Sequence, residues 1–176
     1  QRFQTLASAG NTSAGRMAAV ADAENGDCLT YLRRLQEAAA AYEAALEHAG
    51  ANQHSPTVAT HRMQLGLVRQ RQGHYTEAAI LYEAARHTFE LLGDPENTAQ
   101  AWRQLGMVRK LDGQLLPALQ ACQQALYLYE RQRNRPGIAE TLGELGHLHQ
   151  ALNQLEEAVL AYRRMAELYA QLGDGR

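Results

Sequence analysis

The chain has 176 residues, of which 45% are hydrophobic and 20% are charged, and its formal net charge at pH 7 is −2. This balance excludes the strongly basic surface of a nucleic-acid-binding protein, so we expect no nucleic-acid partner. No apolar run approaches the roughly 20 residues of a membrane span and no signal peptide is visible, so we expect a cytoplasmic protein without a membrane partner.

The N-terminal part has the weakest pattern. Residues 1–12 are polar and small without a period, and we expect a tail or linker there. Residues 13–24 are compatible with a short helix. Asn25 and Gly26 look like a turn, and Asp27 would then be the N-cap of a long helix that ends near position 48.

The next segment predicts two helices, from about Pro56 to Gln72 and from about Tyr75 to Leu92, because apolar or small residues recur at helical spacing. The same pattern returns about every 40 residues, so the chain is built from repeated helix pairs. The residues that recur at this interval are Leu65-Gly66, Leu105-Gly106 and Leu145-Gly146; Ala59, Ala99 and Ala139; Ala78, Ala118 and Ala158; and Gly73, Gly113 and Asn153.

Two of these repeated positions have a clear physical role. Gly73, Gly113 and Asn153 lie at the joint within each pair, where a left-handed residue ends the first helix. The glycine of each Leu-Gly lies in mid-helix, where it costs about 1 kcal/mol relative to alanine. We therefore expect the second helix to approach closely at this glycine, with a recurrent alanine on its side of the crossing.

The period divides the chain into four repeats, at 13–54, 55–94, 95–134 and 135–176. The first is degenerate, since only its second helix keeps the pattern, at Ala38, Tyr42 and Ala45. Atypical terminal repeats are expected because an end helix lacks an outer neighbour.

The third repeat carries the fullest signature, which consists of Trp102, Leu105, Gly106, Ala118, Cys122 and Ala125. It resembles the tetratricopeptide repeat. That repeat is usually about 34 residues long, and the form that this chain resembles has about 40. The resemblance implies an all-α fold, a right-handed superhelical array of antiparallel helix pairs. It covers roughly residues 28 to 176 and indicates the fold better than the task.

The resemblance also implies that the first helices line a concave groove that binds a peptide or helix. Flexible apolar residues such as Met63 and Met107 would adapt to such a partner, and Arg71, Arg103 and Lys110 would favour an acidic one. Some apolar positions could instead pack against a neighbouring helix. The groove positions are Thr60, Met63, Leu67, Gln70, Arg71, Gln100, Arg103, Met107, Lys110, Leu111, Glu140, Gly143, His147, Gln150 and Ala151.

No pattern indicates catalysis, a cofactor or a metal. Cys28 and Cys122 are far apart, and Cys122 takes a position that tyrosine holds in other repeats, which indicates a small buried core residue. His147 and His149 point in different directions on a helix and do not chelate as an i, i+4 pair would. We therefore expect neither an enzyme nor a metal site.

Two functions stay open: a protein-interaction module, and a ligand-sensing segment of a multidomain signalling ATPase or transcription regulator. We expect a fragment of a larger protein, because Gln1 begins the chain and its end, at Leu172-Gly173-Asp174, repeats the start of an earlier repeat. The last helix could also support self-association through an exposed apolar face, which consists of Leu155, Val159, Tyr162, Met165, Tyr169 and Leu172.

Overall fold

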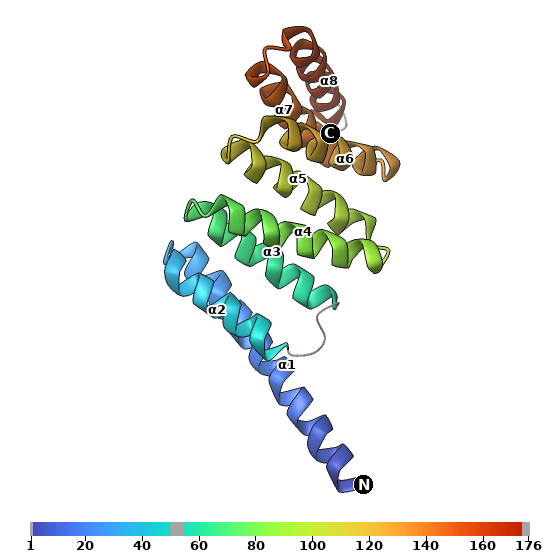
Figure 1. The fold of residues 1–176 in the computed structure, drawn as a ribbon. Helices are drawn as coiled ribbons and strands as arrows, with labels where there is room; N and C mark the ends of the chain where they lie inside the picture. Colours follow the sequence, from blue (N-terminus) through green and yellow to red (C-terminus); the bar gives the residue numbers. More distant parts are fainter. Residues whose placement is uncertain (1, 50–54, 174–176) are drawn as a thin grey trace. The chain divides into compact units, whose positions relative to one another are not determined.

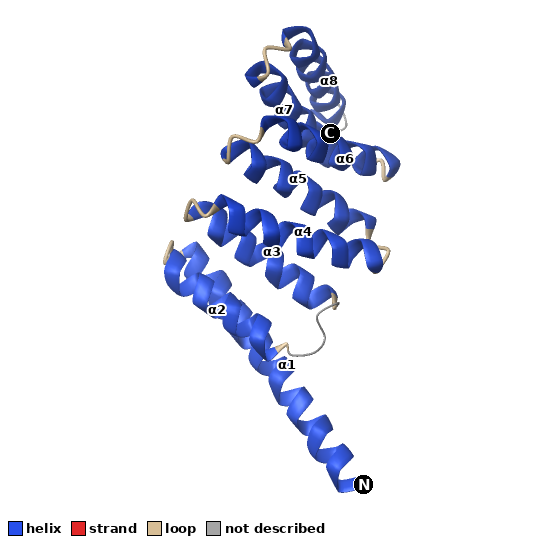
Figure 2. Cartoon of the chain, in the orientation of Figure 1, coloured by secondary structure: helices blue, strands red, loops and turns tan. Residues whose placement is uncertain are grey.

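The computed structural model describes the backbone of residues 2–49 and 55–173, and the side chains of 14–49 and 55–171. All regular structure in these residues is helical, which confirms the predicted all-α fold of helix pairs (Figures 1 and 2). The helices are α1 (Arg2–Tyr31), α2 (Leu35–His48), α3 (Pro56–Arg71), α4 (Tyr75–Leu91), α5 (Pro95–Leu111), α6 (Leu115–Arg131), α7 (Arg135–Ala151) and α8 (Leu155–Gly173).

The chain divides into two compact units, residues 1–88 and 89–176, and the boundary falls within α4. In the first unit α1 packs on α2, and α2 packs on α3. In the second unit α5, α6, α7 and α8 pack in chain order, each on the next. Within the described residues, no helix has both the length and the apolar character needed to cross a membrane.

Helices α3, α5 and α7 begin at capped ends. The side chains of Ser55, Asp94 and Asn134 each accept a hydrogen bond from the backbone N–H three residues later, at 3.2, 3.1 and 2.9 Å. A proline follows within the first two helical positions of each helix, where its missing N–H is not needed. These caps fix where each of the three helices starts.

The turns within the pairs confirm the predicted left-handed joints. Gly73, Gly113 and Asn153 have φ angles of +82°, +77° and +59°. In the first pair the same place is held by Arg33, with φ +59°. An arginine is costly in this conformation, which is why the sequence gives no sign of a joint there.

The predicted close crossing is confirmed at the mid-helix glycines, but the side chains nearest Gly66 and Gly146 are tyrosines instead of the predicted alanines. A Cβ added to Gly66 would lie 2.7 Å from Cε1 of Tyr82, and one added to Gly146 would lie 2.6 Å from Cζ of Tyr162. Either distance is shorter than side chains tolerate. The glycines therefore allow the two helices of a pair to approach.

The first pair corrects the turn predicted at Asn25 and Gly26. Helix α1 runs through both residues, and Gly26 packs against Tyr42 of α2, where an added Cβ would lie 2.9 Å from the ring. Gly26 is thus the crossing glycine, one repeat period before Gly66. Asp27 is not an N-cap; its carboxylate accepts a hydrogen bond of 2.6 Å from the Tyr42 hydroxyl. The turn lies instead at residues 32–34, because α2 begins at Leu35.

Residues 2–12 belong to the same continuous helix α1, so secondary structure does not mark the predicted boundary between a tail at 1–12 and a repeat domain at 13–176. That division, like the other repeat boundaries, stays a prediction. Gln1, residues 50–54 at the end of the first repeat, and Asp174 lie outside the described residues, as does the side chain of Leu172.

Candidate functional site

In the second unit, helices α5 and α7 touch directly and carry ten of the predicted groove positions. We call these ten positions the α5–α7 surface. Arg103, Met107, Lys110 and Gly143 are half-buried in it. The exposed members are Gln100, Leu111, Glu140, His147, Gln150 and Ala151.

Both cations of the α5–α7 surface are paired across the two helices. Arg103 Nη1 lies 3.2 Å from Glu140 Oε2, and Lys110 Nζ lies 2.5 Å from Glu144 Oε2. Their side chains are only 18% and 27% exposed. These two pairs hold α5 against α7, and they leave little net positive charge for the acidic partner that the sequence suggests.

Two further members of the surface contact Tyr162 of α8. The His147 ring meets the Tyr162 ring edge-on, with centroids 5.8 Å apart, and the Tyr162 hydroxyl donates to Gln150 Oε1 at 2.8 Å. In the first unit the Tyr82 hydroxyl likewise donates to Gln70, at 3.1 Å. Gln70 and Gln150 therefore each bind the hydroxyl of a tyrosine on the following helix, a role that their spacing of two repeat periods could have indicated.

The first unit presents the other five predicted groove positions on α3. Thr60 and Arg71 are exposed, whereas Met63, Leu67 and Gln70 are half-buried. The Thr60 hydroxyl donates to the Pro56 carbonyl at 3.0 Å. Met63 and Leu67 remain partly accessible apolar side chains.

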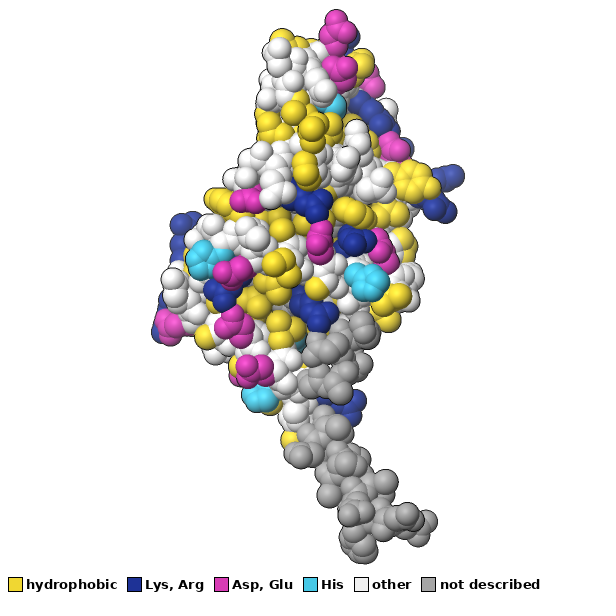
Figure 3. All heavy atoms as spheres, in the orientation of Figure 1, with side chains coloured by type: hydrophobic (Ala, Val, Ile, Leu, Met, Phe, Trp, Pro, Cys, Tyr) yellow, Lys and Arg dark blue, Asp and Glu magenta, His cyan; other side chains and the backbone are white. Residues whose placement is uncertain are grey.

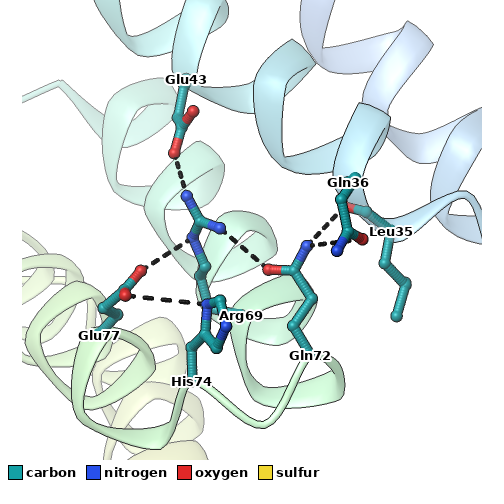
Figure 4. Close-up of polar contacts among 7 residues, drawn as sticks. All are labelled: Leu35, Gln36, Glu43, Arg69, Gln72, His74 and Glu77. Atoms are coloured by element: carbon teal, nitrogen blue, oxygen red, sulfur yellow. Dashed lines mark hydrogen bonds and ion pairs between the residues drawn. The ribbon is translucent and has the colours of Figure 1, made fainter.

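A polar network fixes the C-terminal end of α3 in the first unit (Figure 4). Arg69 pairs with Glu43 of α2, lies 3.1 Å from Glu77 of α4, and donates to Gln72 at 3.0 Å. Gln72 in turn donates to the Leu35 carbonyl at 3.0 Å. The start of α2 and the end of α3 are therefore joined at this point.

Beside this network lies a cavity of about 480 Å³, lined by Thr30, Tyr31, Arg33, Leu35 and Arg71. Of these only Arg71 is a predicted groove residue. Tyr31 and Arg33 were missed because the sequence suggested a helix through positions 27–48, with no turn to expose them. Their place is evident only once the joint at Arg33 is known.

The described residues include a fully buried cysteine and no cluster of metal ligands. Cys122 is fully buried, which confirms its predicted core position, and burial raises the pKa of its thiol to about 12. No three His, Cys, Asp or Glu side chains in the described ranges gather as a metal site. On the face drawn in Figure 3, acidic and basic side chains are intermixed, with hydrophobic ones between them.

Comparison with known proteins gives one family match and several shared folds. Residues 97–174 match the tetratricopeptide repeat. No curated protein sequence matches the chain. Among solved structures, BtubC (BKLC) from P. vanneervenii has a TM-score of 0.84 at 20% identity, over 90% of this chain and 65% of its own.

Two further structures share the fold. Nearly identical TPR-like repeats of a putative kinesin light chain from Podosopora anserina have a TM-score of 0.76 at 18% identity, over 88% of this chain and 76% of their own. Aspartyl phosphate phosphatase F from Bacillus subtilis has a TM-score of 0.81 at 13% identity, over 89% of this chain and 41% of its own. The chain thus spans less than half of the phosphatase. The family match thus covers residues 97–174, and the solved structures show that the chain shares the fold of TPR-like helical repeats.

Proposed function

We propose that the first helices of this protein bind a polypeptide segment. The observation that carries the proposal is the α5–α7 surface, where partly accessible Met107 and exposed Leu111 lie on the same helix as Arg103 and Lys110, the cations that pair with α7. Leu111 is 48% exposed. Helices or extended peptides commonly bind where apolar anchors alternate with polar groups.

The pairing of Arg103 and Lys110 shapes the proposed specificity in the second unit. Because Glu140 and Glu144 already neutralise these cations, binding there would depend mainly on apolar contacts at Met107 and Leu111. Methionine is unbranched and polarisable, and it adapts to partners of different shape.

A matched pair of variants tests the proposal. Peptides selected from a random displayed library against the whole chain should bind Leu111→Gln about tenfold more weakly, because one apolar anchor is lost. Leu116→Gln is the control, since Leu116 is also exposed, at 61%, but lies on α6. Calorimetric titration of both variants with the selected peptides gives the affinities.

Equal weakening by the two substitutions would show that the peptides bind through general hydrophobicity. Loss of peptide affinity in Leu116→Gln alone would show that the peptides bind to the second helices of the pairs. Either result contradicts the proposal, provided that both variants keep the helical circular dichroism of the parent.

We also propose that α8 mediates self-association with a second copy of the chain. On α6, Leu115 and Leu119 are half-buried against a cluster that includes Leu145 and Leu148 of α7. The equivalent side chains of α8, Leu155 and Val159, are 59% and 46% exposed. The face that a neighbouring helix covers on α6 is thus open on α8, and a second copy would bury it.

Light scattering over a concentration series tests this self-association. The parent should show a mass that rises with concentration, and Val159→Lys should abolish the rise because it places a charge in the apolar face. Leu116→Lys, on α6, should leave it unchanged. A strictly monomeric parent would contradict the proposal.

A sensing role within a larger regulator is the second candidate function. It is favoured by the occurrence of this fold as a segment of a longer chain, since the protein spans 41% of aspartyl phosphate phosphatase F. The full-length reading frame tests it. An effector domain on the same polypeptide supports sensing, and its absence favours the interaction module.

A further inference from the structure

The cavity beside α1, α2 and α3 combines charge with apolar surface. Thr30 and Tyr31 come from the last turn of α1, Arg33 from the following joint, Leu35 from the start of α2, and Arg71 from the end of α3. Three helix ends thus contribute to one cavity of about 480 Å³. Tyr31 is 90% exposed, so its ring is open to a ligand.

The two arginines of the cavity differ from the cations of the α5–α7 surface, Arg103 and Lys110, which are both paired. Within residues 14–49 and 55–171, no carboxylate forms an ion pair with Arg33 or Arg71. Asp27 brings an acidic group to the same region, but its carboxylate accepts the hydrogen bond from Tyr42. Arg71 also lies close enough to the Tyr42 and Tyr82 hydroxyls to interact with them electrostatically. The cavity therefore has two cations available to a ligand.

The backbone around the cavity is fixed by polar contacts. Gln72, next to Arg71, donates to the carbonyl of Leu35, which is itself a lining residue (Figure 4). The Arg33 N–H donates to the Thr30 carbonyl at 3.1 Å. The positions from which the two arginines extend are consequently set before any ligand binds, which lowers the entropic cost of binding.

Arg33 occupies a backbone conformation that suits glycine better. Its φ is +59°, and glycine holds the equivalent joint at Gly73 and Gly113. A left-handed arginine carries a conformational cost that glycine would avoid. Here the cost places a guanidinium group at the cavity.

We propose that this cavity binds a carboxylate side chain of an acidic polypeptide segment, with an adjacent apolar side chain against Tyr31 and Leu35. Two guanidinium groups suit a carboxylate because each can donate a pair of parallel N–H hydrogen bonds. The inference rests on the proposed function and deepens it, since it assigns the acidic preference to the first unit.

The test uses the whole chain and a capped tetrapeptide of two glutamates between two leucines, with the glutamine version of that peptide as the neutral control. Binding is followed by NMR of backbone amides and arginine Nε–H groups. The acidic peptide should shift the signals of Arg33, Arg71 and Tyr31. Its affinity should fall about tenfold in Arg33→Gly and in Arg71→Gln, because each variant loses charge-assisted hydrogen bonds.

Arg133→Gly is the matched control. Arg133 also has a left-handed backbone, with φ +55°, but lies at another joint, so this variant should bind as the parent does. Equal affinity of the acidic and the glutamine peptide would overturn the inference, as would unchanged affinity in Arg33→Gly. Inorganic phosphate that shifts the same signals at lower concentration than the peptide would overturn the assignment to carboxylates.

The two proposals can fail separately. Library-selected peptides could lose affinity in Leu111→Gln while the acidic tetrapeptide binds Arg33→Gly and Arg71→Gln as tightly as the parent. In that case only the assignment of a carboxylate to the cavity is wrong. If the tetrapeptide loses affinity in both arginine variants but Leu111→Gln does not weaken the library-selected peptides, the assignment of peptide binding to the α5–α7 surface is wrong.

Discussion

Gly26 of α1 lies against the ring of Tyr42 of α2, and a Cβ added to Gly26 would come within 2.9 Å of two ring carbons. This contact is the same as that of Gly66 with Tyr82, one repeat period later. The first helix pair therefore follows the geometry of the others, although its first helix lacks the leucine before the glycine.

The close crossing predicts opposite effects for two glycines of α7. Gly146→Ala should lower the free energy of unfolding by about 1–3 kcal/mol, because the new methyl group would overlap the Tyr162 ring. Gly143→Ala should be neutral or stabilising by up to about 1 kcal/mol, since it meets only the Met165 sulfur, at 3.2 Å, and alanine favours the helix. Urea unfolding of both variants measures the difference, and equal effects would contradict the assigned crossing.

The left-handed backbone of Arg33 predicts that binding and stability can be separated. The free energy of unfolding of Arg33→Gly should equal that of the parent or exceed it by up to about 1 kcal/mol. Glycine avoids the cost of the left-handed conformation, and this gain is partly offset because glycine gives the unfolded chain more conformational freedom. Thermal and urea unfolding give the comparison, and Arg133→Gly should behave alike. A clear loss of stability in Arg33→Gly would show that the side chain has a structural role.

The sequence predicted the repeat, its period and three of its joints because those positions use the residues that the geometry prefers. Gly73, Gly113 and Asn153 are typical left-handed residues. It failed in the first pair, where Arg33 holds the joint and Asn25 replaces the leucine beside Gly26. Counting one repeat period back from Gly66 would have corrected this error, since the period is a stronger signal than local turn propensity.

The candidate site could be predicted only in part. The helix positions of Arg103 and Lys110 followed from the repeat register, but their pairing with Glu140 and Glu144 depends on how α5 and α7 pack. The cavity at Arg33 was not predictable, because it joins an unrecognised turn between α1 and α2 to the end of α3, which is distant in the sequence.

The salt bridge between Arg103 and Glu140 gives a prediction about charge reversal. Arg103→Glu should destabilise the second unit, because it places two carboxylates together across α5 and α7. The double variant Arg103→Glu with Glu140→Arg should recover about 0.5–1 kcal/mol of unfolding free energy relative to the sum of the single changes, a modest value because Glu140 is half exposed. Additive effects in the double-mutant cycle would mean that the pair does not form in solution.

Buried His61 predicts a stability change with pH. Burial lowers its pKa below the ordinary 6.5, so below pH 6.5 the unfolded chain binds more protons at this position than the folded chain. The free energy of unfolding should therefore fall as the pH drops below about 6.5, and His61 should add no pH dependence above that value. His61→Thr, which takes the residue that Thr141 holds two repeat periods later, should lose this part of the pH dependence in urea titrations between pH 5 and pH 8. An identical slope in the variant would contradict the assignment.

The central claim, that the first helices bind a polypeptide, is tested most directly by methyl NMR of the four methionines. Met63 and Met107 lie at groove positions on α3 and α5, whereas Met17 is exposed on α1 and Met165 packs from α8 on the core. A library-selected peptide should shift the methyl signal of Met63 or Met107 and leave Met17 unchanged. Shifts confined to Met17 or Met165 would contradict the claim.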